Sequence, residues 1–177
     1  MKALICFTFD QKFKTYLEWL PALLSSHEGI EVLPQKGLPL HMTIWGGLEM
    51  NCASWRERLK NTVAVLAPFR GVLPTIKKIE PHQMFDNYFG LRFDLLNYVM
   101  TGNEDRNRFM CDHVGGKDFD LGQTRHTTLV KLRKDVDKYA VANLCMRGTR
   151  KFLKDNPYDL SSVRFVPKIF VKSPTWD

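Results

Sequence analysis

Apolar and polar residues in the first 50 positions follow two periodicities in turn. Positions 4–9 are almost entirely aliphatic or aromatic, which predicts a buried strand. Asp10 follows as a suitable N-cap for a helix. The apolar stripe of that helix consists of Phe13, Leu17, Leu20 and Leu24. Pro21 interrupts the stripe, so we expect a kink or an early end near Leu20.

A second helix is predicted over positions 54–66. Gly29 and the Pro34–Pro39 segment indicate a turn or loop, and an uncharged stretch, Leu38–Leu48, follows. Ser54 and Glu57 then have the spacing of a capping box. The apolar face consists of Trp55, Leu59, Val63 and Leu66, and Pro68 and Gly71 end the helix.

The second half of the chain begins with strand patterns. Positions 72–80 and 88–95 predict two strands around a turn at Pro81–Asn87, which together would form a hairpin. A third helix is predicted over Asn97–His113, ended by Gly115 and Gly116. The spacing of its apolar residues fits a helix poorly.

The end of the chain predicts a strand, a helix and a closing strand. The strand covers positions 127–132 and the helix 136–153. The buried face of this helix is expected at Val136, Tyr139 or Ala140, Leu144 and Phe152. Pro167 interrupts the closing strand, as is typical of an edge or a bulge. The order of elements predicts one α/β or α+β domain of two similar lobes over 1–177.

Two short stretches of the chain read alike, 40–44 and 125–129. Each contains a histidine, a threonine two residues later and then an aliphatic residue. Strand alternation would place His41 and Thr43 on one face, and His126 and Thr128 on one face. The pairs lie about half the chain apart, which favours a duplicated architecture with the two histidine strands adjacent and a shared cleft.

Composition and charge narrow the class of protein. The 177 residues are 44% hydrophobic and 25% charged, as in ordinary globular proteins. The net charge of +7 favours an anionic partner such as a nucleic acid or nucleotide. The charge by itself is equally consistent with a basic protein that has no such partner. Four scattered cysteines, without a C-x-x-C, indicate reduced thiols in the cytoplasm. We expect neither a secretory signal nor a membrane span.

The paired histidines suit proton transfer at a phosphodiester. An unperturbed pKa near 6.5 lets one imidazole accept a proton while the other donates one. The threonine hydroxyls would bind the non-bridging phosphate oxygens. No metal is required, and no carboxylate cluster is present to hold one. A single His-x-Thr would carry little weight, but two on apolar strands at matching places favour function. For His27, His82 and His113 we expect surface or structural roles.

Aromatic and basic residues near the pairs are secondary candidates. Trp45 continues the face of His41 by alternation, so it is either a stacking residue for a nucleobase or a core or lid tryptophan. Phe85 and Tyr88 could add a second stacking surface. Arg125 and Lys131 alternate onto the opposite face from His126, where a solvated or salt-bridged role is expected.

The two motifs in a chain of this size resemble those of the 2H phosphoesterase superfamily, which includes 2′-5′ RNA ligase-like proteins, cyclic nucleotide phosphodiesterases and 2′,5′-phosphodiesterases. The resemblance implies an α+β bilobal fold, with two pseudo-symmetric lobes whose antiparallel sheets line a central cleft and whose helices lie outside. It implies that His41 and His126 are catalytic and that Thr43 and Thr128 bind phosphate. The long approach at 115–123 and the poor third helix depart from the pattern.

We therefore predict a cytoplasmic, monomeric, metal-independent phosphodiesterase without a cofactor. Its substrates would be RNA ends, 2′,5′-linked oligonucleotides, 2′,3′-cyclic phosphates or cyclic (oligo)nucleotides, and degradation of a nucleotide signal is compatible with this. The alternative is a non-catalytic RNA- or nucleotide-binding domain. A third, weaker alternative is a zinc enzyme that uses His41, His126 and another histidine.

Overall fold

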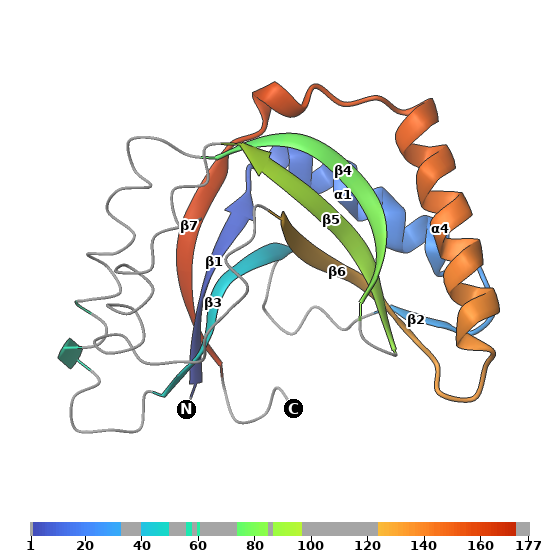
Figure 1. The fold of residues 1–177 in the computed structure, drawn as a ribbon, viewed down its shortest axis with the longest axis horizontal. Helices are drawn as coiled ribbons and strands as arrows, with labels where there is room; N and C mark the ends of the chain where they lie inside the picture. The colour runs from blue at the N-terminus through green and yellow to red at the C-terminus, as the bar shows by residue number, and fades with distance from the viewer. Residues whose placement is uncertain are drawn as a thin grey trace.

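The computed structural model describes residues 2–32, 40–49, 56–57, 60, 74–84, 87–96 and 124–172 (Figure 1). The order of its elements is β1 (Lys2–Phe9), α1 (Gln11–Leu24), β2 (Ile30–Val32), β3 (His41–Glu49), β4 (Thr75–Met84), β5 (Tyr88–Leu96), β6 (Thr124–Leu132), α4 (Lys138–Asp155), the 3-10 turn η3 (Leu160–Ser162) and β7 (Phe165–Lys172).

These strands form two antiparallel sheets. One has the order β3-β1-β7 and the other β2-β6-β5-β4. Strand β3, an edge of the first sheet, lies against β6 of the second (Figure 1). The expected α+β class is confirmed, because every strand pairing is antiparallel. The predicted adjacency of the two histidine strands is confirmed as well.

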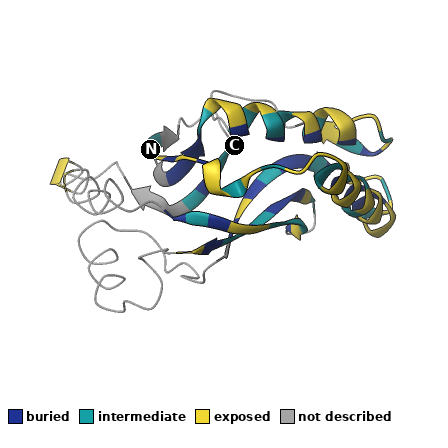
Figure 2. Cartoon of the chain, turned by 90° about the horizontal axis from the view of Figure 1, so that it is seen from above, coloured by how far each residue is buried: buried dark blue, intermediate teal, exposed yellow. Residues whose placement is uncertain are grey.

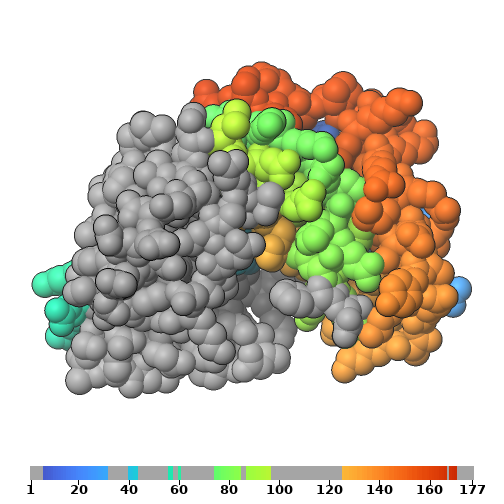
Figure 3. Space-filling view, in the orientation of Figure 1, coloured from blue at the N-terminus to red at the C-terminus, as the bar shows by residue number. Residues whose placement is uncertain are grey.

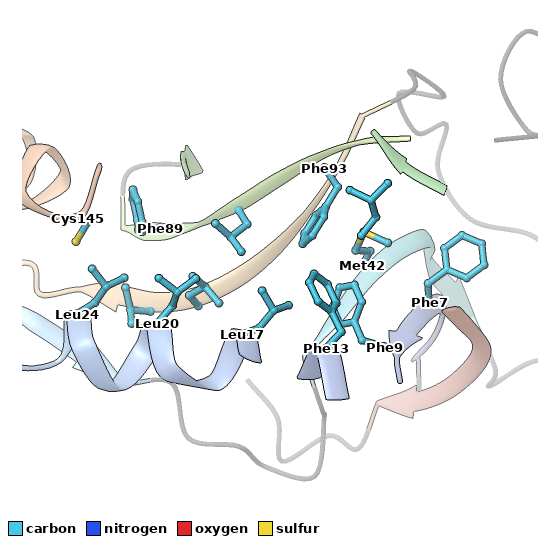
Figure 4. Close-up of a cluster of buried hydrophobic side chains, with 14 of the residues drawn as sticks. Phe7, Phe9, Phe13, Leu17, Leu20, Leu24, Met42, Phe89, Phe93 and Cys145 are labelled. Atoms are coloured by element: carbon cyan, nitrogen blue, oxygen red, sulfur yellow. The ribbon is translucent and has the colours of Figure 1, made fainter. Parts of the chain in front are cut away.

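One buried apolar cluster joins the two sheets to helices α1 and α4. It includes the four residues of the predicted α1 stripe, Phe13, Leu17, Leu20 and Leu24, each with 0% exposure. Phe9 connects the layers, with ring centroids 5.3 Å from Phe13 and 5.6 Å from Phe93 of β5 (Figure 4). Figure 2 shows α1 above the strands, with its exposed residues outward. Burial of each large side chain contributes about 1.5–3 kcal/mol.

Helix α1 begins at its predicted cap, Asp10. Of the two outcomes predicted near Leu20, a kink or an early end, the early end does not occur. The Asp10 carboxylate accepts a hydrogen bond from the backbone N–H of Phe13 at 3.0 Å. The early end near Leu20 is wrong, because the helix continues through Pro21 to Leu24. Pro21 lies in the last turn, where its missing N–H removes one hydrogen bond while Leu24 still buries its side chain.

Helix α4 turns a different face to the core than expected. Tyr139 is 79% exposed, its alternative Ala140 is also exposed and Leu144 is 36% exposed, so their predicted burial is wrong. The buried side chains of the helix are those of Val141, Ala142, Cys145 and Thr149. These side chains are small or short, and they let α4 pack against β4 and α1. The prediction favoured the larger apolar residues, whereas close packing selects small ones. The expected positions Val136 and Phe152 are partly buried against the same cluster.

The predicted hairpin is present, but β4 begins at Thr75 and extends beyond its predicted end at position 80. It continues through Pro81 to Met84, and Pro81 is accommodated because β4 is an edge strand of its sheet. The closing strand β7 also contains its proline, Pro167, on a sheet edge as expected. The three-residue strand β2 was not predicted, since so short a segment has no measurable period.

Several predictions concern residues outside the described part of the chain. These are most of the helix at 54–66, the third helix at 97–113, the approach at 115–123, and Cys52 and Cys111. Of the four cysteines expected to be reduced, Cys6 and Cys145 are described and both are free and buried. No helix among the described residues is both long and apolar enough to span a membrane.

Candidate active site

The first histidine pair lies on β3 with the geometry that alternation predicts. His41 and Thr43 are half-buried on one face, and Met42 between them is fully buried in the core. In the register of β1 and β3, His41 lies opposite Thr8 and Thr43 lies opposite Cys6. The side chains of both pair members therefore lie on the sheet face away from the core.

The second pair lies on β6 and repeats this arrangement. His126 is exposed and Thr128 is half-buried, while Thr127 between them is only 1% exposed. Thr128 donates a weak hydrogen bond from Oγ1 to the Met84 sulfur at 4.0 Å. The predicted sharing of a face by His126 and Thr128 is thus present in the fold.

Neighbouring strands bring the two pairs together from opposite halves of the sequence. Strand β3 lies against β6, so an edge of the first sheet meets the second sheet along the two strands that carry the motifs. His41 is near enough to His126 for its positive charge to lower the pKa of the His126 imidazole. Two imidazoles and two hydroxyls therefore border one region of the molecule.

The environment of His126 favours its neutral form. Burial is the main cause of its lowered pKa, although the residue keeps solvent-exposed surface, and the charges of His82, Arg125 and His41 lower the pKa further, in that order. A neutral imidazole at neutral pH can accept a proton. A bound phosphate would raise the pKa again, because a negative charge favours the imidazolium.

A polar patch extends from His126 across the second sheet, and sequence analysis did not find it. We call it the open-face patch: Arg92 on β5 with Lys78, Glu80 and His82 on β4. Arg92 lies opposite His126 across β5 and β6, and Glu80 lies opposite Arg92 across β4 and β5. Directly opposed residues in antiparallel strands share a face. On the other face Leu91 and Phe93 are fully buried, so the patch lies away from the core.

Within the open-face patch, Glu80 is paired with two cations. Arg92 donates to Glu80 Oε2 at 2.6 Å, and Lys78 forms an ion pair with the other oxygen of Glu80. These two hydrogen bonds lower the pKa of the Glu80 carboxyl, so it is ionised at neutral pH. In Figure 3, the side chains of β4 and β5 reach the surface on the side away from α1.

His82 also lies in this region, and the surface or structural role expected for it stays a prediction. It lies opposite Gly90, which in turn lies opposite Thr128. Burial, followed by the charge of Arg92, lowers the pKa of His82. His82 lies on this face because β4 continues beyond Pro81. A turn was predicted at Pro81–Asn87, so His82 was not expected on a strand.

Gly90 is required at the centre of this arrangement. A Cβ atom there would lie 2.0 Å from the backbone oxygen of Thr127 and 2.8 Å from the terminal methyl of Met84. The pairing of β5 with β6 shifts register at this point, between Phe89 and Gly90. The close backbone approach and the bulge together fix the strand that carries Thr128.

The bulge also corrects one prediction about the flanking basic residues. Arg125 lies on the face opposite His126 as expected, but it is only 7% exposed rather than solvated. Leu129 and Val130 are both buried at the bulge, so the alternation shifts and Lys131 returns to the side of His126. The Lys131 ammonium lies 3.7 Å from Glu31, in agreement with the expected salt-bridged role.

Of the three aromatic candidates, the structure describes the side chain of Tyr88 but not those of Trp45 and Phe85. Tyr88 is 37% exposed and occupies the same face of β5 as Arg92, opposite Lys131. The backbone of Trp45 belongs to β3, but its side chain lies outside the described residues, as does all of Phe85. An aromatic contact not anticipated is that of Phe170, whose ring centroid lies 6.4 Å from that of His41.

The first sheet adds a thiol and a lysine beside Thr43. Cys6 lies between Thr43 and Lys168 in the register of β3, β1 and β7. Burial raises the pKa of the Cys6 thiol to about 12, although the charge of Lys168 opposes this. The thiol is therefore protonated and unreactive at neutral pH. Within the described ranges, no three His, Cys, Asp or Glu side chains form a group that could hold a metal ion.

Comparisons with known proteins give one distant likeness. No protein-family model matches the sequence, and a search of curated proteins finds no match. A solved structure of Usb1 from Kluyveromyces marxianus with uridine monophosphate is similar over 96% of this chain and 92% of that chain. The sequences are 13% identical and the TM-score is 0.47. A likeness of this size carries no argument about family or activity.

Proposed function

We propose that this protein is a metal-independent phosphodiesterase in which His41 and His126 transfer protons while Thr43 and Thr128 hold the phosphate. The observation that carries the proposal is the placement of both pairs on neighbouring strands, with His41 close enough to lower the pKa of His126. The resemblance of the motifs to those of the 2H phosphoesterase superfamily implies the same roles.

The reaction needs one neutral and one protonated imidazole. The neutral imidazole takes a proton from the attacking hydroxyl as its oxygen bonds to phosphorus, and the imidazolium protonates the leaving oxygen as its bond to phosphorus breaks. The lowered pKa of His126 in the free protein favours it as the acceptor. Attack by a neighbouring ribose hydroxyl gives a cyclic phosphate, and attack by water gives a terminal phosphate.

The substrate class we propose is a nucleotide phosphodiester: an RNA end, a 2′,5′-linked oligonucleotide, a 2′,3′-cyclic phosphate or a cyclic (oligo)nucleotide. The net charge of +7 and the Arg92 guanidinium, on the residue opposite His126 in the strand register, support an anionic substrate. Tyr88 on the same face offers a π-surface for a base, and such stacking contributes about 1–3 kcal/mol per base.

A substrate panel tests the proposal. Purified protein is incubated with 2′,5′-linked, 3′,5′-linked and 2′,3′-cyclic substrates, each with excess EDTA and without it, and the products are identified by mass spectrometry. We expect turnover of at least one class at an equal rate under both conditions. Turnover that EDTA abolishes would contradict metal independence and favour the zinc alternative, and no turnover of any substrate would contradict the enzyme.

A binding domain without catalysis is the main alternative. It predicts saturable binding of the same oligonucleotides, measured by fluorescence anisotropy, with no product after long incubation. The enzyme predicts product from the wild-type protein and, from His41→Ala, binding without product. The two functions are therefore separated by measuring both quantities on the same samples.

A further inference from the structure

We propose that Arg92 determines specificity by binding a second, non-scissile phosphate of the substrate beside the phosphate held at His126 and Thr128. The inference rests on the proposed function and names the preferred substrate class within it. Substrates with at least two consecutive phosphates, linear or cyclic oligonucleotides, would be preferred over nucleotides with a single phosphate.

The register of the second sheet places Arg92 next to the catalytic pair. Arg92 lies directly opposite His126, and neighbouring strands are about 4.8 Å apart. The side chain of Arg92 is 42% exposed, so an anion can reach it. Its charge also reaches His82, whose pKa it lowers. Arg92 therefore lies between two imidazoles on the face that the substrate would contact.

Glu80 holds Arg92 in place without using all of its donors. One Nη nitrogen donates to Glu80 Oε2 at 2.6 Å, whereas a guanidinium has five N–H donors in a fixed fork. The Nε atom is buried and has no hydrogen-bond partner among the described residues, so the donors that remain for a ligand are those of the Nη atoms. A planar fork with donors left over matches a phosphate group, which arginine binds in bidentate fashion.

Arg92 lies closer to His126 in the strand register than Lys78 does. Lys78 and Arg92 share this single carboxylate, so the three side chains together carry a net positive charge. Lys78 lies on β4, two register positions from Glu80 and opposite Asp94, whereas Arg92 lies on β5 directly opposite His126, so Arg92 is the cation that a phosphate beside the catalytic pair would meet.

The competing explanation is that Arg92 and Glu80 form only a structural ion pair on the sheet surface. Three variants separate the two. Arg92→Gln removes the charge and the fork, Arg92→Lys keeps the charge alone, and Lys78→Gln is the matched control that removes an equal charge from the same carboxylate. Melting temperatures of all three show whether the fold is retained.

The activity test compares a dinucleoside with one phosphodiester and a trinucleoside with two, both without terminal phosphates. For Arg92→Gln we expect kcat/KM on the trinucleoside to fall about 10- to 100-fold and on the dinucleoside less than about 3-fold. We expect Arg92→Lys to lie between wild type and Arg92→Gln, and Lys78→Gln to change neither substrate more than about 3-fold. Equal losses on both substrates, or no loss on either, would overturn the inference, as would an equal effect of Lys78→Gln.

A binding arm keeps this test independent of catalysis. Affinities of the same oligonucleotides are measured for His41→Ala and for His41→Ala with Arg92→Gln, over a range of salt concentrations. We expect the second substitution to abolish the gain in affinity from the second phosphate and to reduce the salt slope by about 0.7. If wild type cleaves nothing, the proposed function fails, and this arm alone decides on Arg92: an unchanged gain and slope would overturn its role.

Discussion

His41 on β3 lowers the pKa of His126 on β6, although the two histidines belong to different sheets. Removal of a positive neighbour raises a lowered imidazole pKa. We therefore predict that His126 in the wild-type protein titrates below 6.5, and that His41→Ala or His82→Ala raises its pKa, with the larger effect from His82→Ala. Heteronuclear NMR titration of the imidazole measures this. A wild-type pKa of His126 at or above 6.5 would contradict the environment described.

The same shifts predict a pH dependence of stability. Burial, the main cause in each case, gives His82 and His126 a lower pKa in the folded than in the unfolded chain, where it is about 6.5. The unfolded state therefore binds more protons below pH 6.5, and the free energy of unfolding should fall as the pH falls from 7.5 to 5.5. Urea denaturation at both values measures the slope. The double variant His82→Gln with His126→Gln should flatten it, and an unchanged slope would assign the effect to other groups.

Two glycine-to-alanine substitutions should have opposite effects. At Gly90 the new Cβ meets the backbone of Thr127 at 2.0 Å, so we expect Gly90→Ala to lower the free energy of unfolding by about 1–3 kcal/mol. At Gly148 in α4 the nearest atom is Leu24 Cδ2 at 3.7 Å, an ordinary contact. Gly148→Ala should therefore raise stability by about 0.5–1 kcal/mol through helix propensity. Urea denaturation measures both, and equal effects would contradict the close approach at Gly90.

Asp10 connects the start of α1 to the chain just before β7. One carboxylate oxygen accepts from Phe13 N–H at 3.0 Å and the other from Arg164 N–H at 2.7 Å. We expect Asp10→Ala to cost about 2 kcal/mol, because it removes a helix cap and a long-range hydrogen bond. Asp137→Ala, which removes the cap of α4 alone, is the control and should cost about 1 kcal/mol. Chemical denaturation that ranks the two in reverse would contradict this account.

Local patterns in the sequence were sufficient for the parts of the fold that depend on period and capping. The apolar stripe from Phe13 to Leu24 and the cap at Asp10 were predicted correctly, because a helix places these residues without reference to any other element. The buried face of α4 was not predicted correctly, because packing against β4 and α1 decides which of its side chains are buried. Pro81 was assigned to a turn for a similar reason: only the edge position of β4 makes it compatible with a strand.

The candidate site divides in the same way. The sharing of a face by His41 and Thr43, and by His126 and Thr128, follows from strand alternation alone. The positions of Arg92 and His82 depend on the register of strands distant in sequence, which no local period contains. Lys131 was assigned to the wrong face because a single bulge residue, visible only in the paired strands, reverses the alternation after Leu129.

The most direct measurement of the central claim is a double-mutant cycle in kcat/KM on the best substrate of the panel, with EDTA present. We predict that His41→Ala and His126→Ala each reduce kcat/KM by about 10²- to 10⁴-fold, and that the double variant loses much less than the product of the two, because the imidazoles act as a unit. His27→Ala, a histidine in the turn after α1, is the control and should retain wild-type activity. Wild-type activity in either single variant would contradict catalysis by the histidine pair.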